Sequence, residues 1–214
     1  MSIEEEHKKG TTTVGIITKE GIVLAADKRA SMGYLIADKD AEKIHLINQN
    51  NAMTFAGSVA DSQMLLRYLQ TEIRLYSIKK GKLVSTNGIA TLLSHFLFGN
   101  AHSFSPFLIQ FIVAGIDELG FHLYDLDMGG SKMEKSTYTS TGSGSPVAYG
   151  VLEDAYEKNL TLNEGVKLAI RAIKAAIKRD MATGDGIDVI TIDKSGAKRF
   201  DKKKLAELTN INEF

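Results

Sequence analysis

Apolar and β-branched residues near the start of the chain form short runs separated by polar turns. Thr12–Thr18 and Gly21–Asp27 flank a two-residue charged turn, and this pattern predicts a hairpin. Lys43–Ile47 and Ala52–Gly57 flank the polar residues 48–51 and predict a second hairpin. We therefore expect the chain to open with two pairs of strands.

Beyond Gly57 the apolar residues recur every three or four positions, as they do on one face of a helix. This spacing predicts a helix over Val59–Lys79 that ends near Gly81. It predicts a second helix over Thr86–Phe98, with Asn100 as its stop.

The second half of the chain returns to strands. Three apolar runs predict strands at Leu108–Ile116, Gly120–Leu126 and Met133–Thr139. A last strand is expected at Gly186–Asp193, and the polar tail after Gly196 carries no prediction.

Two helices are expected between these strands. Proline suits the first turn of a helix, so Ser145-Pro146 predicts a helix that runs to Glu157. Thr161 and Glu164 have the spacing of a capping box and predict the start of a helix that extends through Ile177.

Strands and helices thus follow one another in blocks, which favours an α+β fold over an alternating βαβ sheet. A four-layer αββα sandwich is one arrangement of these elements among others. No linker interrupts Thr11–Gly196, and residues 11–214 are expected to form a single domain. A polar leader at residues 1–10, which we expect to be disordered, precedes it.

The amino-acid composition excludes several classes of function. Lysine plus arginine and aspartate plus glutamate number 26 each, so no basic excess is available for nucleic acid. The chain has no cysteine, which excludes disulfides and thiolate chemistry. The leader has no apolar core, and the longest apolar stretch, Phe107–Gly115, is too short to span a bilayer. We expect a cytoplasmic protein that does not engage a membrane.

Common catalytic motifs are missing. The sequence contains no GxSxG elbow, no HExxH and no phosphate-binding loop. The histidines are scattered without metal-ligand spacing, so we expect surface or structural histidines and neither a metal nor a cofactor: His7, His45, His95, His102 and His122.

Gly10-Thr11-Thr12-Thr13 lies at the border between the leader and the first strand. Alone, this junction is typical of a strand start, because threonine favours strands. It gains meaning together with stretches spread along the chain: TTTVGI from Thr11, LAADKRAS from Leu24, EKIH from Glu42, FAGSVAD from Phe55, STGSGSPVAYGVLE from Ser140 and KRDMATGDGID from Lys178. In their order and spacing, the residues from Thr11 to Asp193 resemble an archaeal-type 20S proteasome β subunit.

The resemblance implies an N-terminal-nucleophile hydrolase fold and a role for each matching residue. Thr11 corresponds to the nucleophile, freed when the leader, a propeptide, is cut after Gly10. Lys43 and Asp27 correspond to the active-site lysine and its acid, and the Gly57 N–H to the oxyanion donor. Ser143 and Asp180 correspond to the pair that orients the threonine. Thr183 stands where the family usually carries serine.

The resemblance also implies a substrate site and partners. Arg29 and Ser31 match positions that support the site and hold the substrate backbone, and the pocket beside the cleaved bond would be lined by Ala30, Ala41, Phe55 and Val59. These four residues are apolar, so cleavage after hydrophobic residues is expected. The implied partners are proteasome α subunits, homo-heptameric or mixed β rings in a four-ring barrel, an ATP-dependent unfoldase and unfolded polypeptides.

The chemistry explains why a terminal threonine suits this role. A free α-amine has a pKa of about 7.7 to 8.0, so roughly a tenth of it is neutral and able to act as a base at pH 7. Lysine, with a pKa of about 10.4, stays charged, so we assign Lys43 as a resident cation. The alternatives are a structural β subunit without activity and another N-terminal-nucleophile hydrolase.

Overall fold

The computed structural model describes residues 10–209, so the expectation for the leader falls outside the described residues except at Gly10. Its first sheet is antiparallel with the strand order β10-β1-β2-β11-β12. These strands are β1 (Thr13–Ile17), β2 (Ile22–Asp27), β10 (Tyr138–Thr141), β11 (Ile187–Asp193) and β12 (Gly196–Arg199). Strand β1, which follows the Gly10-Thr11 junction, is therefore an internal strand of its sheet.

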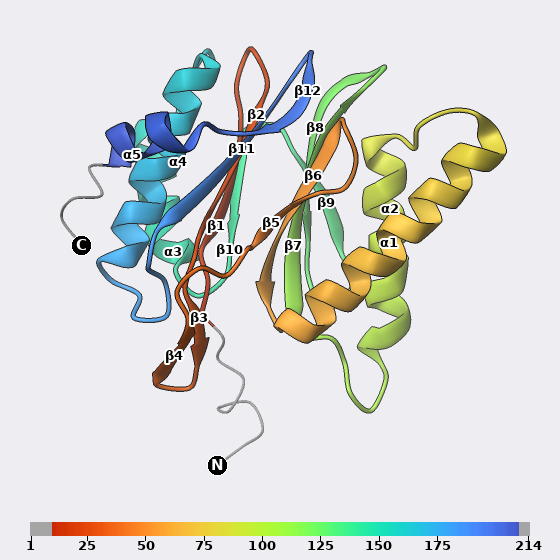
Figure 1. The fold of residues 1–214 in the computed structure, drawn as a ribbon, viewed down its shortest axis with the longest axis horizontal. Coiled ribbons are helices and arrows are strands. Elements are labelled where there is room, and N and C mark those ends of the chain that lie inside the picture. The colour runs from red at the N-terminus through yellow and green to blue at the C-terminus, as the bar shows by residue number, and fades with distance from the viewer. Residues whose placement is uncertain (1–9, 210–214) are drawn as a thin grey trace.

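A second antiparallel sheet has the order β5-β6-β7-β8-β9. It contains β5 (Ile44–Leu46), β6 (Asn51–Gly57), β7 (Ile109–Asp117), β8 (Gly120–Leu126) and β9 (Lys132–Lys135). The two sheets face one another in the middle of the molecule (Figure 1).

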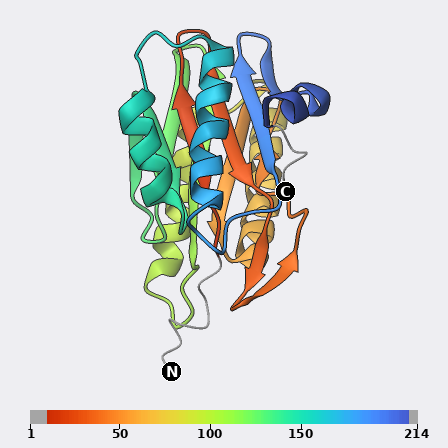
Figure 2. The same cartoon turned by 90° about the vertical axis from the view of Figure 1, so that its left-hand side faces the viewer.

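Helices cover the outer face of each sheet. Helices α3 (Ser145–Ala155) and α4 (Leu162–Ile177) pack on the first sheet, as Figure 2 shows. Helices α1 (Val59–Lys80) and α2 (Thr86–Ala101) pack on the second. The short helix α5 (Lys202–Thr209) lies beside α4. Mixed helices and antiparallel sheets confirm the α+β class.

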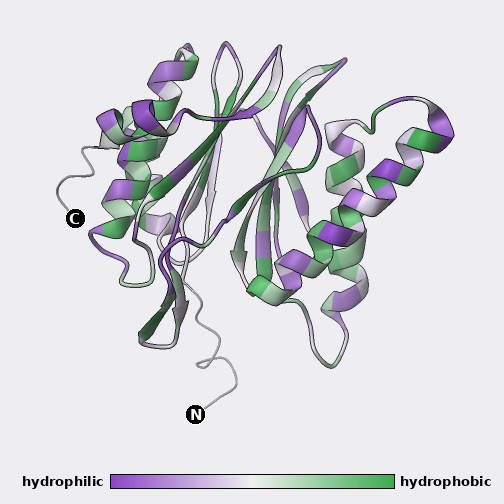
Figure 3. Ribbon diagram, in the orientation of Figure 1, coloured by the Kyte–Doolittle hydropathy of each residue, from purple (hydrophilic) through white to green (hydrophobic). Residues whose placement is uncertain are grey.

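Strand β2 contributes apolar side chains both to the core between the two sheets and to the core under helices α3 and α4. All six of its residues are buried, because side chains alternate between the two faces of a strand and both faces are covered. Ile22 and Leu24 point into the cluster between the sheets, whereas Val23 and Ala25 join the cluster under α3 and α4. Hydrophobic residues accordingly gather along the strands in Figure 3.

Local signals placed most elements correctly. The hairpins form as expected, Gly81 ends α1 in a left-handed conformation, and Thr161 and Glu164 form the predicted capping box of α4. Helix α2 continues to Ala101, beyond the predicted end, and α3 stops two residues early at Ala155.

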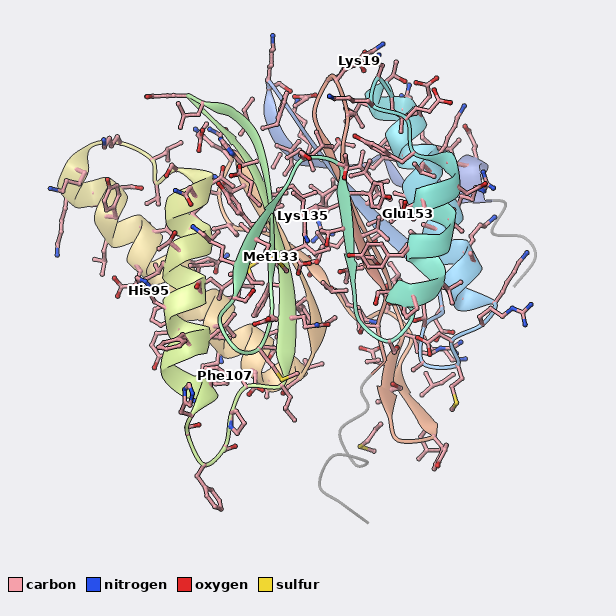
Figure 4. All side chains as sticks on the ribbon, turned by 180° about the vertical axis from the view of Figure 1, so that it is seen from behind. Lys19, His95, Phe107, Met133, Lys135 and Glu153 are labelled. Atoms are coloured by element: carbon pink, nitrogen blue, oxygen red, sulfur yellow. The ribbon has the colours of Figure 1, made fainter. Side chains whose placement is uncertain are left out.

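The predicted strand Met133–Thr139 is wrong in one respect. Residues 132–135 form β9 of the second sheet, and after residues 136–137 the chain continues as β10 of the first sheet. Met133 and Lys135 are labelled on β9 in Figure 4. The apolar pattern did not reveal this crossing, because both strands remain extended and only their partners change. A small hairpin, β3 (Ala30–Met32) and β4 (Leu35–Asp38), was also not predicted.

Candidate active site

The Gly10-Thr11 junction is buried at the start of β1. Thr11 is 3% exposed, and its Oγ1 donates a 2.6 Å hydrogen bond to the carbonyl oxygen of Gly10. The Thr11 backbone N–H donates to Ser143 Oγ at 3.3 Å, and the Gly10 N–H donates to Ser31 Oγ at 3.1 Å. The hydroxyl thus rests against the carbonyl group of the bond that precedes it.

A tight turn after β10 contacts the backbone of Thr11. Gly142 has a φ of +91°, and a Cβ added there would lie 2.1 Å from the Thr11 carbonyl oxygen. Only glycine permits this approach without strain. The turn brings the Ser143 hydroxyl to the Thr11 nitrogen, although the two residues are 132 positions apart in the chain.

Lys43 and Asp27 form a buried ion pair next to this junction. The Lys43 Nζ lies 2.8 Å from Asp27 Oδ1, and their side chains are 3% and 0% exposed. Asp27 also accepts backbone hydrogen bonds from Thr12, Arg29 and Gly184. All four partners are donors, which is the environment of a carboxylate.

Burial and the charge of the partner shift the pKa values of Asp27 and Lys43 in opposite directions. Burial raises the pKa of the Asp27 carboxyl, and the nearby Lys43 ammonium and backbone N–H groups oppose that rise. Burial lowers the pKa of Lys43, and Asp27 opposes that shift. Because every group around Asp27 donates, we assign the pair as charged, with Lys43 a cation.

A chain of hydroxyls joins Asp180 to the junction. Asp180 Oδ2 accepts from Ser143 Oγ at 2.5 Å and from Thr183 Oγ1 at 2.6 Å. Thr183 Oγ1 lies 2.8 Å from Thr12 Oγ1. The buried Thr183 hydroxyl therefore links Asp180 to Thr12.

Arg29 does not line the cavity at the junction. Its Nε donates to Asp185 Oδ2 at 2.6 Å and its Nη1 to the carbonyl oxygen of Met181 at 2.8 Å. Asp185 has a positive φ of 61°, which non-glycine residues seldom adopt. The guanidinium thus holds the turn that carries Asp180.

A cavity of about 250 Å³ opens beside Thr11. Its wall contains every residue that the sequence assigned to the substrate pocket, together with several residues of the junction: Gly10, Thr11, Ala30, Ser31, Ala41, Lys43, Phe55, Gly57 and Val59. Gly57 ends β6 with a φ of +132°. The pocket residues come from the unpredicted β3, the residues after β4, β6 and the start of α1, which only the fold brings together.

Sequence reasoning missed the polar part of this cavity. Its wall also contains Asp38, Asp40, Glu42, His45 and Gln63. The sequence predicts His45 as a surface or structural histidine. A signal was present in the predicted strand, since positions 43 and 45 lie on the same face of a strand and Lys43 was already assigned to the site.

An antiparallel α+β fold that gathers a buried hydroxyl, an ammonium–carboxylate pair and a chain of hydroxyls at one cavity has the arrangement of a hydrolase. Among residues 10–209, no cluster of three or more histidine, aspartate or glutamate side chains could hold a metal ion. No helix in the described part of the chain has the length and apolarity needed to cross a membrane.

Comparison with known proteins agrees with this class. A family model described as proteasome subunit matches residues 7–192. The chain is 49% identical to proteasome subunit beta of Methanococcus aeolicus, over 97% of this chain and 95% of that protein. It is 45% identical to proteasome subunit beta of Methanosarcina mazei, over 94% of this chain and 95% of the relative. The chain belongs to the proteasome subunit family, as its motifs predicted.

Proposed function

We propose that this chain is a catalytic β subunit of a 20S proteasome core, a threonine endopeptidase that degrades unfolded proteins to peptides. The observation that carries the proposal is the 2.6 Å hydrogen bond from Thr11 Oγ1 to the Gly10 carbonyl, beside the buried Lys43–Asp27 pair. The family and the named relatives support the assignment to a proteasome β subunit.

The first reaction in this proposal is self-processing. Thr11 Oγ1 attacks the Gly10 carbonyl carbon, the C–N bond to Thr11 breaks, and the nitrogen gains a proton to become a free amine. The resulting ester between Gly10 and the Thr11 oxygen is then hydrolysed by water. Residues 1–10 leave as a propeptide, and residues 11–214 remain as a single N-terminal-nucleophile hydrolase domain of the αββα type.

Processing creates the base that the second reaction needs. While Gly10 is attached, the Thr11 nitrogen is an amide and cannot accept a proton. The free amine, oriented by Ser143 and Asp180, takes the proton of the Thr11 hydroxyl, and Lys43 stabilises the developing negative charge. The Gly57 N–H stabilises the oxyanion, a contribution typically worth about 100- to 1000-fold in rate.

Specificity follows from the cavity wall. Ala30, Ala41, Phe55 and Val59 provide apolar surface for the side chain before the cleaved bond. We expect the large Phe55 side chain to limit the depth of this pocket. We expect faster cleavage after hydrophobic residues than after charged ones at neutral pH. Ser31 is placed to accept a hydrogen bond from the substrate backbone, as it does from the Gly10 N–H.

The proposed setting is a cytoplasmic four-ring barrel. Rings of seven β subunits, of this chain alone or mixed with another, stack between rings of α subunits. An ATP-dependent unfoldase delivers unfolded chains through the α rings. Enclosure suits an endopeptidase of broad specificity, because folded proteins cannot reach the nucleophile.

Two measurements on the particle assembled with its α-type partner test this proposal. Intact mass and N-terminal sequencing should show a chain that begins at Thr11, together with cleavage of fluorogenic peptides. Thr11→Val, which keeps the shape but removes the hydroxyl, should assemble, retain residues 1–10 and cleave nothing, whereas Thr11→Ser should retain activity. A wild-type particle that keeps Met1 would instead favour a structural β subunit.

A further inference from the structure

His45 lies where it can act on the bound substrate. It belongs to β5, and its ring stacks on Phe55 in the wall of the cavity, with 5.4 Å between ring centroids and 5° between ring planes. Its side chain is 21% exposed, so it is partly desolvated but reaches the open space. The neutral imidazole extends the apolar surface of Phe55.

From this placement we infer that His45 is a specificity-determining residue whose protonation shifts the cleavage preference from hydrophobic toward acidic side chains. The inference rests on the proposed peptidase function. A neutral ring favours an apolar side chain beside Phe55, whereas an imidazolium in the same place attracts a carboxylate or sulfonate.

The surrounding charges do not fix the imidazole in its protonated form. His45 Nδ1 is 3.8 Å from Glu42 Oε1, beyond hydrogen-bond distance, and Glu42 is itself in contact with the Arg199 guanidinium. Burial lowers the pKa of His45 from its ordinary value of 6.5. The ring is therefore mainly neutral at pH 8 and gains a proton as the pH falls.

Other charged groups also face the cavity. From β4 and the residues after it come Asp38 and Asp40, and Asp40 pairs with Lys28 at 2.6 Å. Lys43 is paired with Asp27, while β6 contributes Phe55 and α1 contributes uncharged residues. The ordinary pKa of an imidazole, about 6.5, lies between pH 5 and 8, so His45 is the wall side chain whose protonation the inference follows over this range.

The experiment compares two fluorogenic peptides that differ only in the residue before the cleaved bond. One carries leucine and the other cysteic acid, whose sulfonate stays ionised throughout the pH range. The assembled, processed particle is assayed from pH 5 to pH 8, and the measured quantity is the ratio of kcat/KM for the sulfonate peptide to that for the leucine peptide. Titration of the shared Thr11 amine cancels in this ratio.

We expect the ratio to rise about tenfold as the pH falls, which corresponds to about 1.4 kcal/mol. His45→Gln keeps a neutral polar side chain and should give a low ratio at every pH. His45→Lys places a permanent charge there and should give a high, nearly constant ratio. His95→Gln is the matched control, since His95 is exposed on α2 and does not line the cavity (Figure 4).

The outcomes separate the inference from the function on which it rests. If the particle cleaves the leucine peptide normally but the ratio of the two kcat/KM values does not change with pH, the proposed role of His45 is wrong. An equal rise in His45→Gln would also overturn it, because the neighbouring carboxylates would then be responsible. A wild-type particle that cleaves neither peptide would overturn the proposed function as well.

Discussion

Gly10→Ala should slow self-processing without changing the mature enzyme. A Cβ built on Gly10 would lie 1.7 Å from the Ala182 Cβ, 2.7 Å from its Cα and 2.9 Å from its carbonyl carbon. Two of these three atoms belong to the backbone, so a rotamer change cannot remove the overlap. The junction must therefore shift away from the position in which Thr11 Oγ1 contacts the Gly10 carbonyl.

The size of the effect follows from overpacking. Added methyl groups in well-packed sites cost about 1–3 kcal/mol, which would slow processing by about 5- to 150-fold if the whole strain acts on the reactive conformation. The assay mixes precursor with its α-type partner and follows the loss of residues 1–10 by intact mass over time. Fully processed Gly10→Ala particles begin at Thr11 and should cleave peptides with the wild-type kcat/KM.

Ala182→Gly provides the matched control. In the double variant the 1.7 Å overlap disappears while those with the residue 182 backbone remain, so the processing rate should recover only in part. Ala182→Gly alone should process at close to the wild-type rate. Processing of Gly10→Ala at the wild-type rate would refute the reasoning, because the described position of Gly10 would then not be the reactive one.

Three further predictions concern the site. Lys43→Met leaves the Asp27 charge buried without its partner, so the free energy of unfolding should fall by about 3–5 kcal/mol and processing should stop, as measured by denaturant unfolding and intact mass. Thr183→Ser keeps the hydroxyl bonded to Asp180 and loses one buried methyl, so unfolding should show a loss of about 1 kcal/mol while peptide cleavage persists. Burial lowers the pKa of His45, so the unfolded chain binds a proton more readily than the folded one. Stability should therefore decline as the pH falls below about 6.5, and this decline should be smaller in His45→Gln during pH-dependent thermal unfolding.

Elements with strong local signals could be predicted from the sequence. The capping box at Thr161 and Glu164, the left-handed Gly81 and the alternating hairpins act over a few residues, so their patterns survive without knowledge of the rest of the chain. The hairpin β3–β4 lacked such a pattern. It is mostly exposed, and its strands have only three and four residues. Its sequence therefore shows no alternation of apolar and polar residues from which the strands could be predicted.

The motifs by themselves identified the family and named Thr11, Lys43, Asp27, Ser143 and Asp180 as one set. Only the tertiary structure decided how these residues meet, because their contacts join segments up to 132 positions apart and depend on close approaches such as that of Gly142 to Thr11. The tertiary structure also divided the extended run after β8 between two sheets and placed His45 against Phe55. A sequence pattern records which face of an element is buried, whereas the partner across that face is chosen by long-range packing.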